Sequence, residues 1–257
     1  MSGKVLLSFD VEEFDLPKEH GEEISLEEGI KFSKVGLKRI LKVLDKTGVK
    51  ATFFCTGNFA KAEPEMLRRM LESGHEIACH GVDHFEPKKT DVAESKKIVE
   101  KSVGKVYGYR QPRMQEIDYN ALKSHGFLYD SSVNPVFVPG RYNHLNAPRK
   151  PFRKNGVIEV PVSVATCMRV PLFWLALHLF PERLYARLAK MALKKTGYFT
   201  TYFHPWEFSD LEKWKCVPGY IKRNSGEKLA LRLERLILML EKYECKFVTY
   251  NEFVKDL

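Results

Sequence analysis

The sequence lacks several features that would assign it to a specialised class of protein. Its five cysteines are odd in number and form no C-x-x-C pair, which favours reduced thiols over a disulfide framework. The longest apolar run covers only the eleven residues 170–180, whereas a helix that spans a bilayer needs about 20 residues. No G-x-G-x-x-G motif follows the first predicted strand, which counts against a dinucleotide-binding sheet. Neither a linker nor an internal repeat is visible, so we expect a single domain over residues 1–257.

The balance of charges is basic. Lys and Arg total 42 and Asp and Glu total 33, which gives a formal net charge of +9 and favours anionic partners such as phosphates, acidic glycans or a membrane surface. We expect no nucleic-acid binding, because no recognised nucleic-acid motif accompanies this charge. No signal peptide is visible before the strand-like segment 5–9, and together with the reduced cysteines this predicts a cytoplasmic protein.

The segment 170–195 has two interpretations. Its apolar first part and the basic residues that follow Pro181 are typical of helices that lie on an anionic membrane face. The simpler interpretation is an ordinary pair of barrel helices with a solvated lysine face. We therefore predict a soluble protein, with peripheral contact to the inner face of a membrane through 170–195 as an alternative.

Short apolar strands alternate with amphipathic helices about every 25 to 30 residues, which is typical of parallel β/α architecture. With seven or eight such units in 257 residues, a barrel is favoured over an open sheet. A long loop over 131–155, with Pro139 and Gly140 near its centre, predicts a functional segment. Predicted strands cover 5–9, 49–56, 77–79, 105–109, 126–129, 157–162, 199–203 and 246–249; predicted helices cover 32–45, 91–103, 118–125 and 229–240, with another beginning at Pro64 and two more divided at Pro181.

Polar residues suited to catalysis follow several of the predicted strands. His80 and His84 come after the strand 77–79, and in a helical turn residues four apart share one face, so the two imidazoles can bind one metal ion. Other predicted strands end in Asp10, Arg110, Asp130 and His204. Each of these residues also has an ordinary interpretation. Asp10 can cap a helix and Arg110 can pair with a carboxylate. Asp130 can stabilise a turn, and His204 can pack against Trp206. Because the carboxyl ends of barrel strands meet at one mouth, their coincidence favours a shared site.

The order of these motifs resembles, over nearly the whole chain, that of the polysaccharide deacetylases, the NodB-homology carbohydrate esterases. The segments that carry the resemblance are Ser8-Phe9-Asp10-Val11-Glu12, the metal-binding H-x3-H motif His80-Gly81-Val82-Asp83-His84, the R-x-P motif Arg110-Gln111-Pro112, the aspartate motif Asp130-Ser131-Ser132 and the late His204. Phe203-His204-Pro205-Trp206-Glu207 is most similar to the branch linked to exopolysaccharide or cell-envelope glycan genes. The resemblance implies an α/β fold, a distorted (β/α)7 TIM-like barrel.

The first motif departs from the family pattern, in which two adjacent acids serve as general base and metal ligand. Val11 stands at the second position and cannot bind a metal ion. Asp10 and Glu12 are two residues apart and therefore point to the same side of an extended strand. We predict that Glu12 joins the two histidines as the third ligand of a divalent ion, most simply Zn²⁺. In the alternatives, Asp10 serves both roles or the protein works without metal.

The resemblance also implies catalytic roles. Asp10 is expected to act as the general base that activates water, and Arg110 to keep it ionised through charge-assisted hydrogen bonds. His204 is expected to protonate the departing amine, and Asp130 to orient His204 and raise its pKa. Trp206 and Pro112 are expected to contact the substrate. The indole offers a flat face to a sugar ring, with a packing role as an equal alternative.

Together these inferences predict a metal-dependent hydrolase that removes an N-acetyl or related acyl group from an amino sugar of a polysaccharide or lipid-linked glycan. One alternative is a related amide hydrolase, either a deformylase of a lipid-linked amino sugar or a metal-independent cyclic-amide hydrolase. Another is a catalytically silent glycan-binding barrel, which Val11 in the first motif favours and the remaining motifs oppose.

Overall fold

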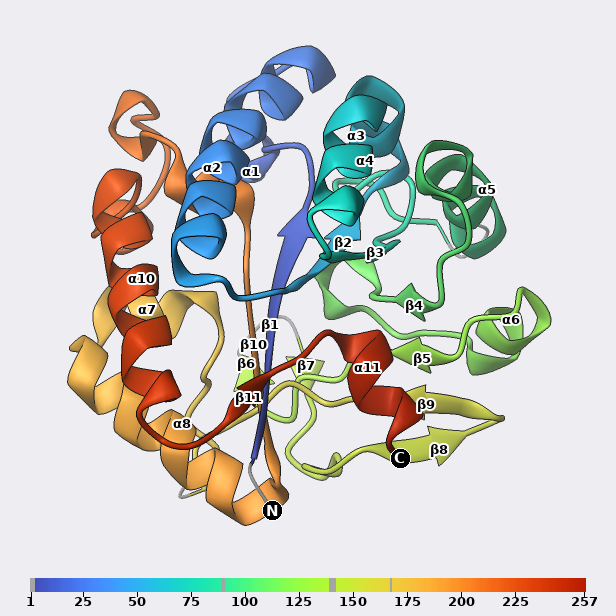
Figure 1. Ribbon diagram of the computed structural model, residues 1–257. Helices are drawn as coiled ribbons and strands as arrows, with labels where there is room; N and C mark the ends of the chain where they lie inside the picture. The colour runs from blue at the N-terminus through green and yellow to red at the C-terminus, as the bar shows by residue number, and fades with distance from the viewer. Residues whose placement is uncertain (1–2, 89–90, 139–141, 167) are drawn as a thin grey trace.

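The computed structural model describes residues 3–88, 91–138, 142–166 and 168–257, and within them the expected parallel β/α barrel is confirmed (Figure 1). The main sheet has nine strands, in the order β10-β1-β2-β3-β4-β5-β9-β8 with β11 beside β1. Of these, β8 is antiparallel to β9 and β11 pairs only with the start of β1, which leaves seven parallel strands. The seven are β1 (Lys4–Val11), β2 (Thr52–Cys55), β3 (Glu76–Cys79), β4 (Gly108–Tyr109), β5 (Tyr129–Asp130), β9 (Val157–Glu159) and β10 (Tyr198–Phe203).

The two ends of the curved sheet are joined by the segment that follows β9. The Ser163 backbone N–H donates to the Thr200 carbonyl at 3.2 Å, and the Thr200 N–H donates to the Ser163 hydroxyl at 2.9 Å. These bonds place the segment against β10, so the barrel is closed by an irregular stretch rather than by a regular strand pair. This irregular closure is the distortion in the predicted (β/α)7 barrel.

The expected loop over 131–155 contains short strands. β8 (Phe152–Lys154) forms an antiparallel hairpin with β9, and β6 (Phe137–Val138) pairs with β7 (Tyr142–Asn143) in a separate ribbon. Pro139 and Gly140, which contributed to the expectation of a loop, lie outside the described residues.

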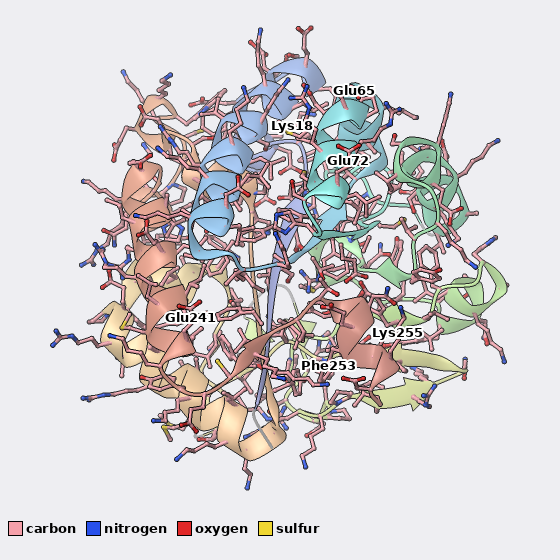
Figure 2. All side chains as sticks on the ribbon, in the orientation of Figure 1. Lys18, Glu65, Glu72, Glu241, Phe253 and Lys255 are labelled. Atoms are coloured by element: carbon pink, nitrogen blue, oxygen red, sulfur yellow. The ribbon has the colours of Figure 1, made fainter. Side chains whose placement is uncertain are left out.

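Helices cover the outside of the barrel. Figure 1 shows α8, α10 and α2 along one flank and α3, α4, α5 and α6 along the other. Charged residues such as Glu65 and Glu72 on α4 and Glu241 on α10 are exposed on the outer surface (Figure 2). The helices are α1 (Leu16–Glu19), α2 (Leu26–Thr47), α3 (Gly57–Ala62), α4 (Pro64–Glu72), α5 (Asp91–Val103), α6 (Tyr119–Ser124), α7 (Trp174–Leu179), α8 (Glu182–Thr196), α9 (Gly219–Lys222), α10 (Glu227–Glu241) and α11 (Tyr250–Lys255), with short 3₁₀ helices η1 (Pro112–Met114), η2 (Pro205–Phe208) and η3 (Leu211–Lys213). β11 covers Lys246–Phe247.

The apolar first part of the segment 170–195 is built into the barrel. α7 buries Ala176, Leu177 and His178, and Trp174 packs against the core. Among the described residues, no helix combines the length and apolar character needed to cross a membrane. Peripheral membrane contact through 170–195 stays a prediction.

Two cysteines lie side by side in the core. Cys55 on β2 is the register partner of Cys79 on β3, and both side chains are fully buried. Burial raises the pKa of the Cys79 thiol to about 12, so it behaves as a small, unreactive core residue. Cys216 and Cys245 are also free thiols, whereas Cys167 lies outside the described residues.

The parallel register gathers the carboxyl ends of four strands, β10, β1, β2 and β3, at one mouth. Phe9 of β1 pairs with Phe203 at the end of β10, and Val11 pairs with Cys55, which in turn pairs with Cys79 at the end of β3. The residues that follow these strands therefore emerge side by side, as the barrel prediction requires.

Helix α2 supports this mouth through η2, the short helix that follows β10. Gly36 lies against η2 so closely that a methyl group there would overlap the Pro205 carbonyl oxygen. Two hydrogen bonds tie the same surfaces together, from the Arg39 guanidinium to the Phe208 carbonyl and from the Ser209 hydroxyl to the Phe32 carbonyl, both at 2.6 Å. Glycine is needed here for close approach.

We expect Gly36→Ala to lower the free energy of unfolding by about 2–3 kcal/mol, because the added methyl group forces α2 and η2 apart. Chemical denaturation measures the change. Val35→Ala is the matched control on the same helix, since Val35 is 49% exposed, and it should change stability by less than about 0.5 kcal/mol. Equal stability of the two variants would contradict the close packing.

Candidate metal and catalytic site

A cavity of about 330 Å³ opens at the mouth of the barrel. Its lining combines polar and titratable side chains with aromatic and aliphatic ones. The polar ones include Asp10, Glu12, Asp15, His80, His84, Gln111, Arg113 and His204, and the others include Leu16, Met114, Phe173, Trp174, Leu175, Tyr202, Trp206, Tyr220 and Ile221.

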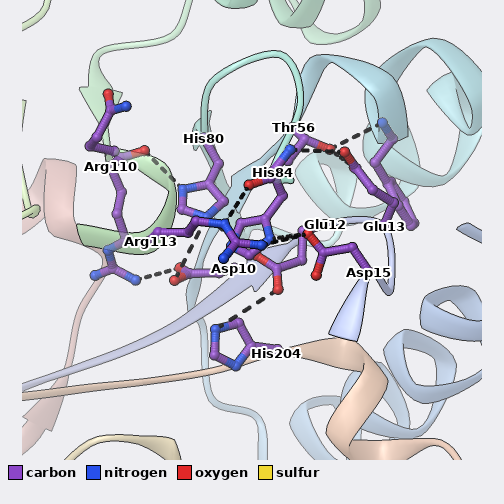
Figure 3. Close-up of polar contacts among 12 residues, drawn as sticks. Asp10, Glu12, Glu13, Asp15, Thr56, His80, His84, Arg110, Arg113 and His204 are labelled. Atoms are coloured by element: carbon purple, nitrogen blue, oxygen red, sulfur yellow. Dashed lines mark hydrogen bonds and ion pairs between the residues drawn. The ribbon is translucent and has the colours of Figure 1, made fainter. Parts of the chain in front are cut away.

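Three potential metal ligands converge in this cavity (Figure 3). Glu12 Oε2 lies 3.4 Å from His80 Nε2 and 3.1 Å from His84 Nε2, and the three ligand atoms all lie within 4.8 Å of one another. Glu12 Oε2 is buried and accepts no hydrogen bond. A buried carboxylate oxygen without a donor is costly unless a cation neutralises it, so this donor set fits a divalent metal ion.

The other nitrogen of each imidazole is held by an acceptor. His80 Nδ1 lies 2.8 Å from the Arg110 carbonyl oxygen, and His84 Nδ1 lies 2.7 Å from Asp15 Oδ2. Because these oxygens only accept hydrogen bonds, each Nδ1 carries a proton, and in the neutral ring Nε2 offers its lone pair toward Glu12. The predicted ligand pair is therefore oriented as metal binding requires.

Charge controls the protonation of His84. Burial alone lowers the pKa of this histidine, but the carboxylates of Glu12 and Asp15 outweigh it and raise the pKa to about 9. A metal ion must displace this proton, so binding is coupled to proton release.

The two histidines are not brought together by a helical turn, as we expected from their spacing. Residues 80–88 form no helix; Gly81 turns the chain at φ 68°, and Glu13 fixes the loop. Glu13 Oε1 accepts from the His84 backbone N–H at 2.9 Å, and Oε2 accepts from the Thr56 hydroxyl at 2.8 Å. The two consecutive glutamates thus have different roles. Glu12 faces the ligand cluster, and Glu13 positions the loop that carries His84.

Asp10 forms a buried ion pair beside the ligand cluster. Its Oδ1 accepts a hydrogen bond from Arg110 at 2.5 Å, and its Oδ2 lies 4.0 Å from His80 Nε2. Burial raises the pKa of Asp10, but the Arg110 guanidinium, followed by His80 and His204, outweighs it and lowers the pKa below its ordinary value. Asp10 is therefore ionised and lies outside the group of converging ligands, which favours Glu12 as the third ligand.

Arg110 is fully buried and completely bonded. Besides Asp10, its N–H groups donate to the hydroxyls of Ser8 and Tyr250 and to both the carbonyl and the hydroxyl of Ser131, all at 3.0–3.1 Å. This network fixes the guanidinium, and the carboxylate of Asp10 with it.

His204 enters from the end of β10. Its Nε2 lies 4.0 Å from Glu12 Oε1, and its Nδ1 lies 2.9 Å from Glu207 Oε1. Burial lowers the pKa of His204, but Glu12, then Glu207 and Asp10, outweigh it and raise the pKa above its ordinary value. The predicted acid thus lies in the same cavity as the predicted base and ligands.

The expected role of Asp130 in orienting His204 is wrong, because Glu207 makes that bond. Asp130 instead accepts from the Ser132 N–H at 3.1 Å and hydroxyl at 2.8 Å within its own turn. It also forms a hydrogen bond with Glu159, its register partner on β9. Burial raises the pKa of both carboxyls, so the pair shares a proton.

Trp206 takes the packing role that was the alternative to substrate contact, whereas Pro112 lies away from the cavity. Trp206 lines the cavity but is only 5% exposed; its Nε1 donates to Glu12 Oε1 at 2.8 Å, and its ring stacks on His204 at 5.0 Å between centroids. It therefore holds two site residues in place rather than offering a free face. Pro112 packs against Gly81 behind the metal loop and is not among the described residues that line the cavity.

Several site residues were not predicted. Asp15 holds His84, and Arg113 bonds to Asp15 and to the His84 carbonyl. The acidic run after β1 hinted at Asp15, and the spacing of Glu207 three residues after His204 is that of a capping box. The cavity-lining residues Phe173, Trp174 and Tyr202 had no such signal, because apolar runs indicate core.

Comparison with known proteins divides the chain into two parts. Residues 24–121 match the family described as polysaccharide deacetylase, and residues 131–255 match a domain of unknown function, DUF3473. Within residues 24–121 the chain is therefore similar to polysaccharide deacetylases. The deacetylase match contains His80, His84 and Arg110 but begins after Asp10 and Glu12, so the departing first motif lies outside it.

Named relatives extend this assignment. The chain is 34% identical over 119 residues to the peptidoglycan deacetylase-like protein FGM2 of Gibberella zeae, and 30% identical over 115 residues to a peptidoglycan deacetylase of Helicobacter pylori. Each match covers 41% of this chain but only 35% and 39% of those relatives. A probable polysaccharide deacetylase from Pseudomonas aeruginosa shares the fold, with a TM-score of 0.65 at 15% identity over 98% of this chain and 89% of that one.

We expect Glu12→Gln to weaken zinc binding by more than the ~10–100-fold typical of losing an outer partner, because it removes a ligand. Isothermal titration calorimetry measures the affinity, and Glu72→Gln, on the exposed face of α4, is the matched control. Affinity of the unaltered protein should fall as the pH is lowered below about 9, since zinc competes with the His84 proton. Unchanged zinc affinity in Glu12→Gln would contradict the ligand assignment.

The Asp130–Glu159 pair yields a pH dependence of stability. Because both folded-state pKa values are raised, the native state binds more protons than the unfolded chain, and stability decreases as the pH rises above the unfolded values. Glu159→Gln removes one of the paired titrations and should lessen this decrease in stability between about pH 5 and about pH 8. Thermal and denaturant unfolding across pH test it, and parallel curves for both proteins would refute the pair.

Proposed function

We propose that the protein is a metal-dependent hydrolase that removes an N-acetyl or related acyl group from an amino sugar of a glycan. The observation that carries this proposal is the unpartnered Oε2 of Glu12 facing His80 and His84, beside the ionised Asp10 and His204. The named relatives, described as peptidoglycan deacetylases, support the reaction class.

The residues of the site suit the steps of amide hydrolysis. A divalent ion bound by Glu12 and the two histidines would polarise the acyl oxygen and acidify water. Asp10, ionised and held by Arg110, takes a proton from the attacking water as the water oxygen bonds to the acyl carbon. As the C–N bond breaks, its electron pair passes to nitrogen, which takes the Nε2 proton of His204. The products are a carboxylic acid and a free amine.

The finer assignments are part of the proposal. Two imidazoles and one carboxylate are a common zinc donor set, which supports zinc as the metal. A cavity of about 330 Å³ that is lined in part by aromatic residues is of a size for one acylated sugar unit, and its apolar side chains would also tolerate a lipid-linked glycan. A cytoplasmic location is supported by the free, buried thiols of Cys55 and Cys79.

Zinc-loaded protein is incubated with N-acetylglucosamine oligomers, and acetate is measured by NMR spectroscopy. We expect acetate release that Asp10→Asn lowers by about 10²–10⁴-fold and Glu72→Gln leaves unchanged. Parallel assays with N-formyl sugars and small cyclic amides separate related hydrolases by their products. Glycan binding without any of these products would contradict the hydrolase and favour the silent barrel.

A further inference from the structure

A second buried histidine lies behind the predicted acid. His178 on α7 has a fully buried side chain and does not line the cavity. Its Nε2 lies 2.7 Å from Glu207 Oε2, while Glu207 Oε1 lies 2.9 Å from His204 Nδ1. Glu207, itself fully buried, thus bridges two imidazoles, of which only His204 reaches the cavity.

The hydrogen-bond partners determine where the protons of this array lie. His178 Nδ1 lies 2.6 Å from the Arg223 carbonyl oxygen, which only accepts. Glu207 is held as an anion: burial raises its pKa, but His178 and His204 outweigh burial and lower the pKa below its ordinary value. Both nitrogens of His178 therefore face pure acceptors, and the ring is bonded as a donor at each of them. The same reasoning puts a proton on Nδ1 of His204.

Ring packing and hydrogen bonds hold the array in place. Trp174 lines the cavity, and its ring meets His178 and His204 edge-on, with centroid distances of 5.8 and 5.6 Å. The His204 backbone N–H also donates to Glu207 Oε1 at 2.6 Å, and the Asn224 amide donates to the His178 carbonyl at 2.7 Å. Each oxygen of the Glu207 carboxylate thus has a fixed donor, so the direction of the carboxylate is set by the fold.

We propose that His178 is a positioning residue that acts through Glu207 to hold His204 with Nδ1 protonated and Nε2 aimed at the departing amine. The proposal rests on the proposed hydrolase function. In the acid step, the Nε2 proton of the His204 imidazolium passes to the nitrogen as the C–N bond breaks, and the ring is left neutral with its Nδ1 proton. His178 and Glu207 keep their protonation states throughout, since they orient the acid and exchange no proton with the substrate.

The kinetic test compares two acyl substrates of the zinc-loaded protein. An N-acetylglucosamine oligomer needs a proton on its leaving amine, whereas 4-nitrophenyl acetate releases an aryl oxide that needs none. We expect His178→Phe and Glu207→Gln to lower kcat for the amide by about 10–100-fold with KM within twofold, and to leave ester hydrolysis within about twofold. The double variant should lose no more than Glu207→Gln alone, because the two residues act as a unit.

The control is His75→Gln, a buried histidine at the opposite end of β3, which should change neither reaction. Equal losses for amide and ester, unchanged amide turnover, or losses that multiply in the double variant would overturn the positioning role of His178. Should His178→Phe fail to fold, Glu207→Gln and His178→Gln provide the same comparison.

A spectroscopic readout separates this proposal from the function on which it rests. Nitrogen-15 NMR of the imidazoles should show His178 protonated on both nitrogens and His204 protonated on Nδ1, with strongly downfield N–H protons that disappear in Glu207→Gln. This pattern without amide turnover would refute the proposed function and leave the array standing. A His178 that carries a proton on only one nitrogen would refute the proposed positioning role, even in an active enzyme.

Discussion

The carboxylate of Glu12 enters a buried space where one of its oxygens meets no hydrogen-bond donor. Desolvating a carboxylate oxygen in this way costs several kcal/mol unless a cation takes the place of water. The neighbouring atoms are the Nε2 atoms of His80 and His84, two imidazoles whose Nδ1 atoms are held by the Arg110 carbonyl and by Asp15. One divalent ion would bind the Glu12 oxygen and both imidazole nitrogens. The remaining contacts of the site keep these three atoms in place.

The support extends outward in layers. Trp206 fixes the other oxygen of Glu12, Asp15 fixes His84, and Glu13 holds the loop between the two histidines. Beyond them, the docking of α2 on η2 through Gly36 sets the position of the segment that carries His204 and Trp206. We therefore expect a change in the packing of α2 on η2 to alter the direction of side chains within the cavity, because the interior is close-packed.

Much of this arrangement could be predicted from the sequence because it follows from periodicity. The alternation of strands and helices predicts the barrel, and the two-residue spacing of Asp10 and Glu12 predicts that both face the mouth. The partner of His204 could not be predicted in this way. Glu207 reaches it through a 3₁₀ turn after β10, whereas Asp130 is drawn into its own turn and toward Glu159. Tertiary contacts decide between two acids that local patterns do not distinguish.

Other misses have the same origin. In the sequence, His178 only interrupts an apolar run, and nothing there predicts a role in the site. In the fold its side chain contacts Glu207. The helical turn expected for the histidine pair is absent from residues 80–88. The turn at Gly81 and the hydrogen bond from the His84 N–H to Glu13 bring the two histidines together instead. The predicted helix 32–45 begins later than α2, which starts at Leu26. The start of α2 is marked by the Ser25–Glu28 capping box and not by an apolar stripe.

The whole arrangement depends on Glu12 as the third ligand of a metal ion held by His80 and His84. Anomalous scattering of zinc in crystals of the full chain soaked with the ion tests this role. We expect one peak about 2.0–2.2 Å from Glu12 Oε2 and from both Nε2 atoms, with Asp10 outside the coordination sphere. A peak bound by Asp10 in place of Glu12, or no peak between the two histidines, would contradict it.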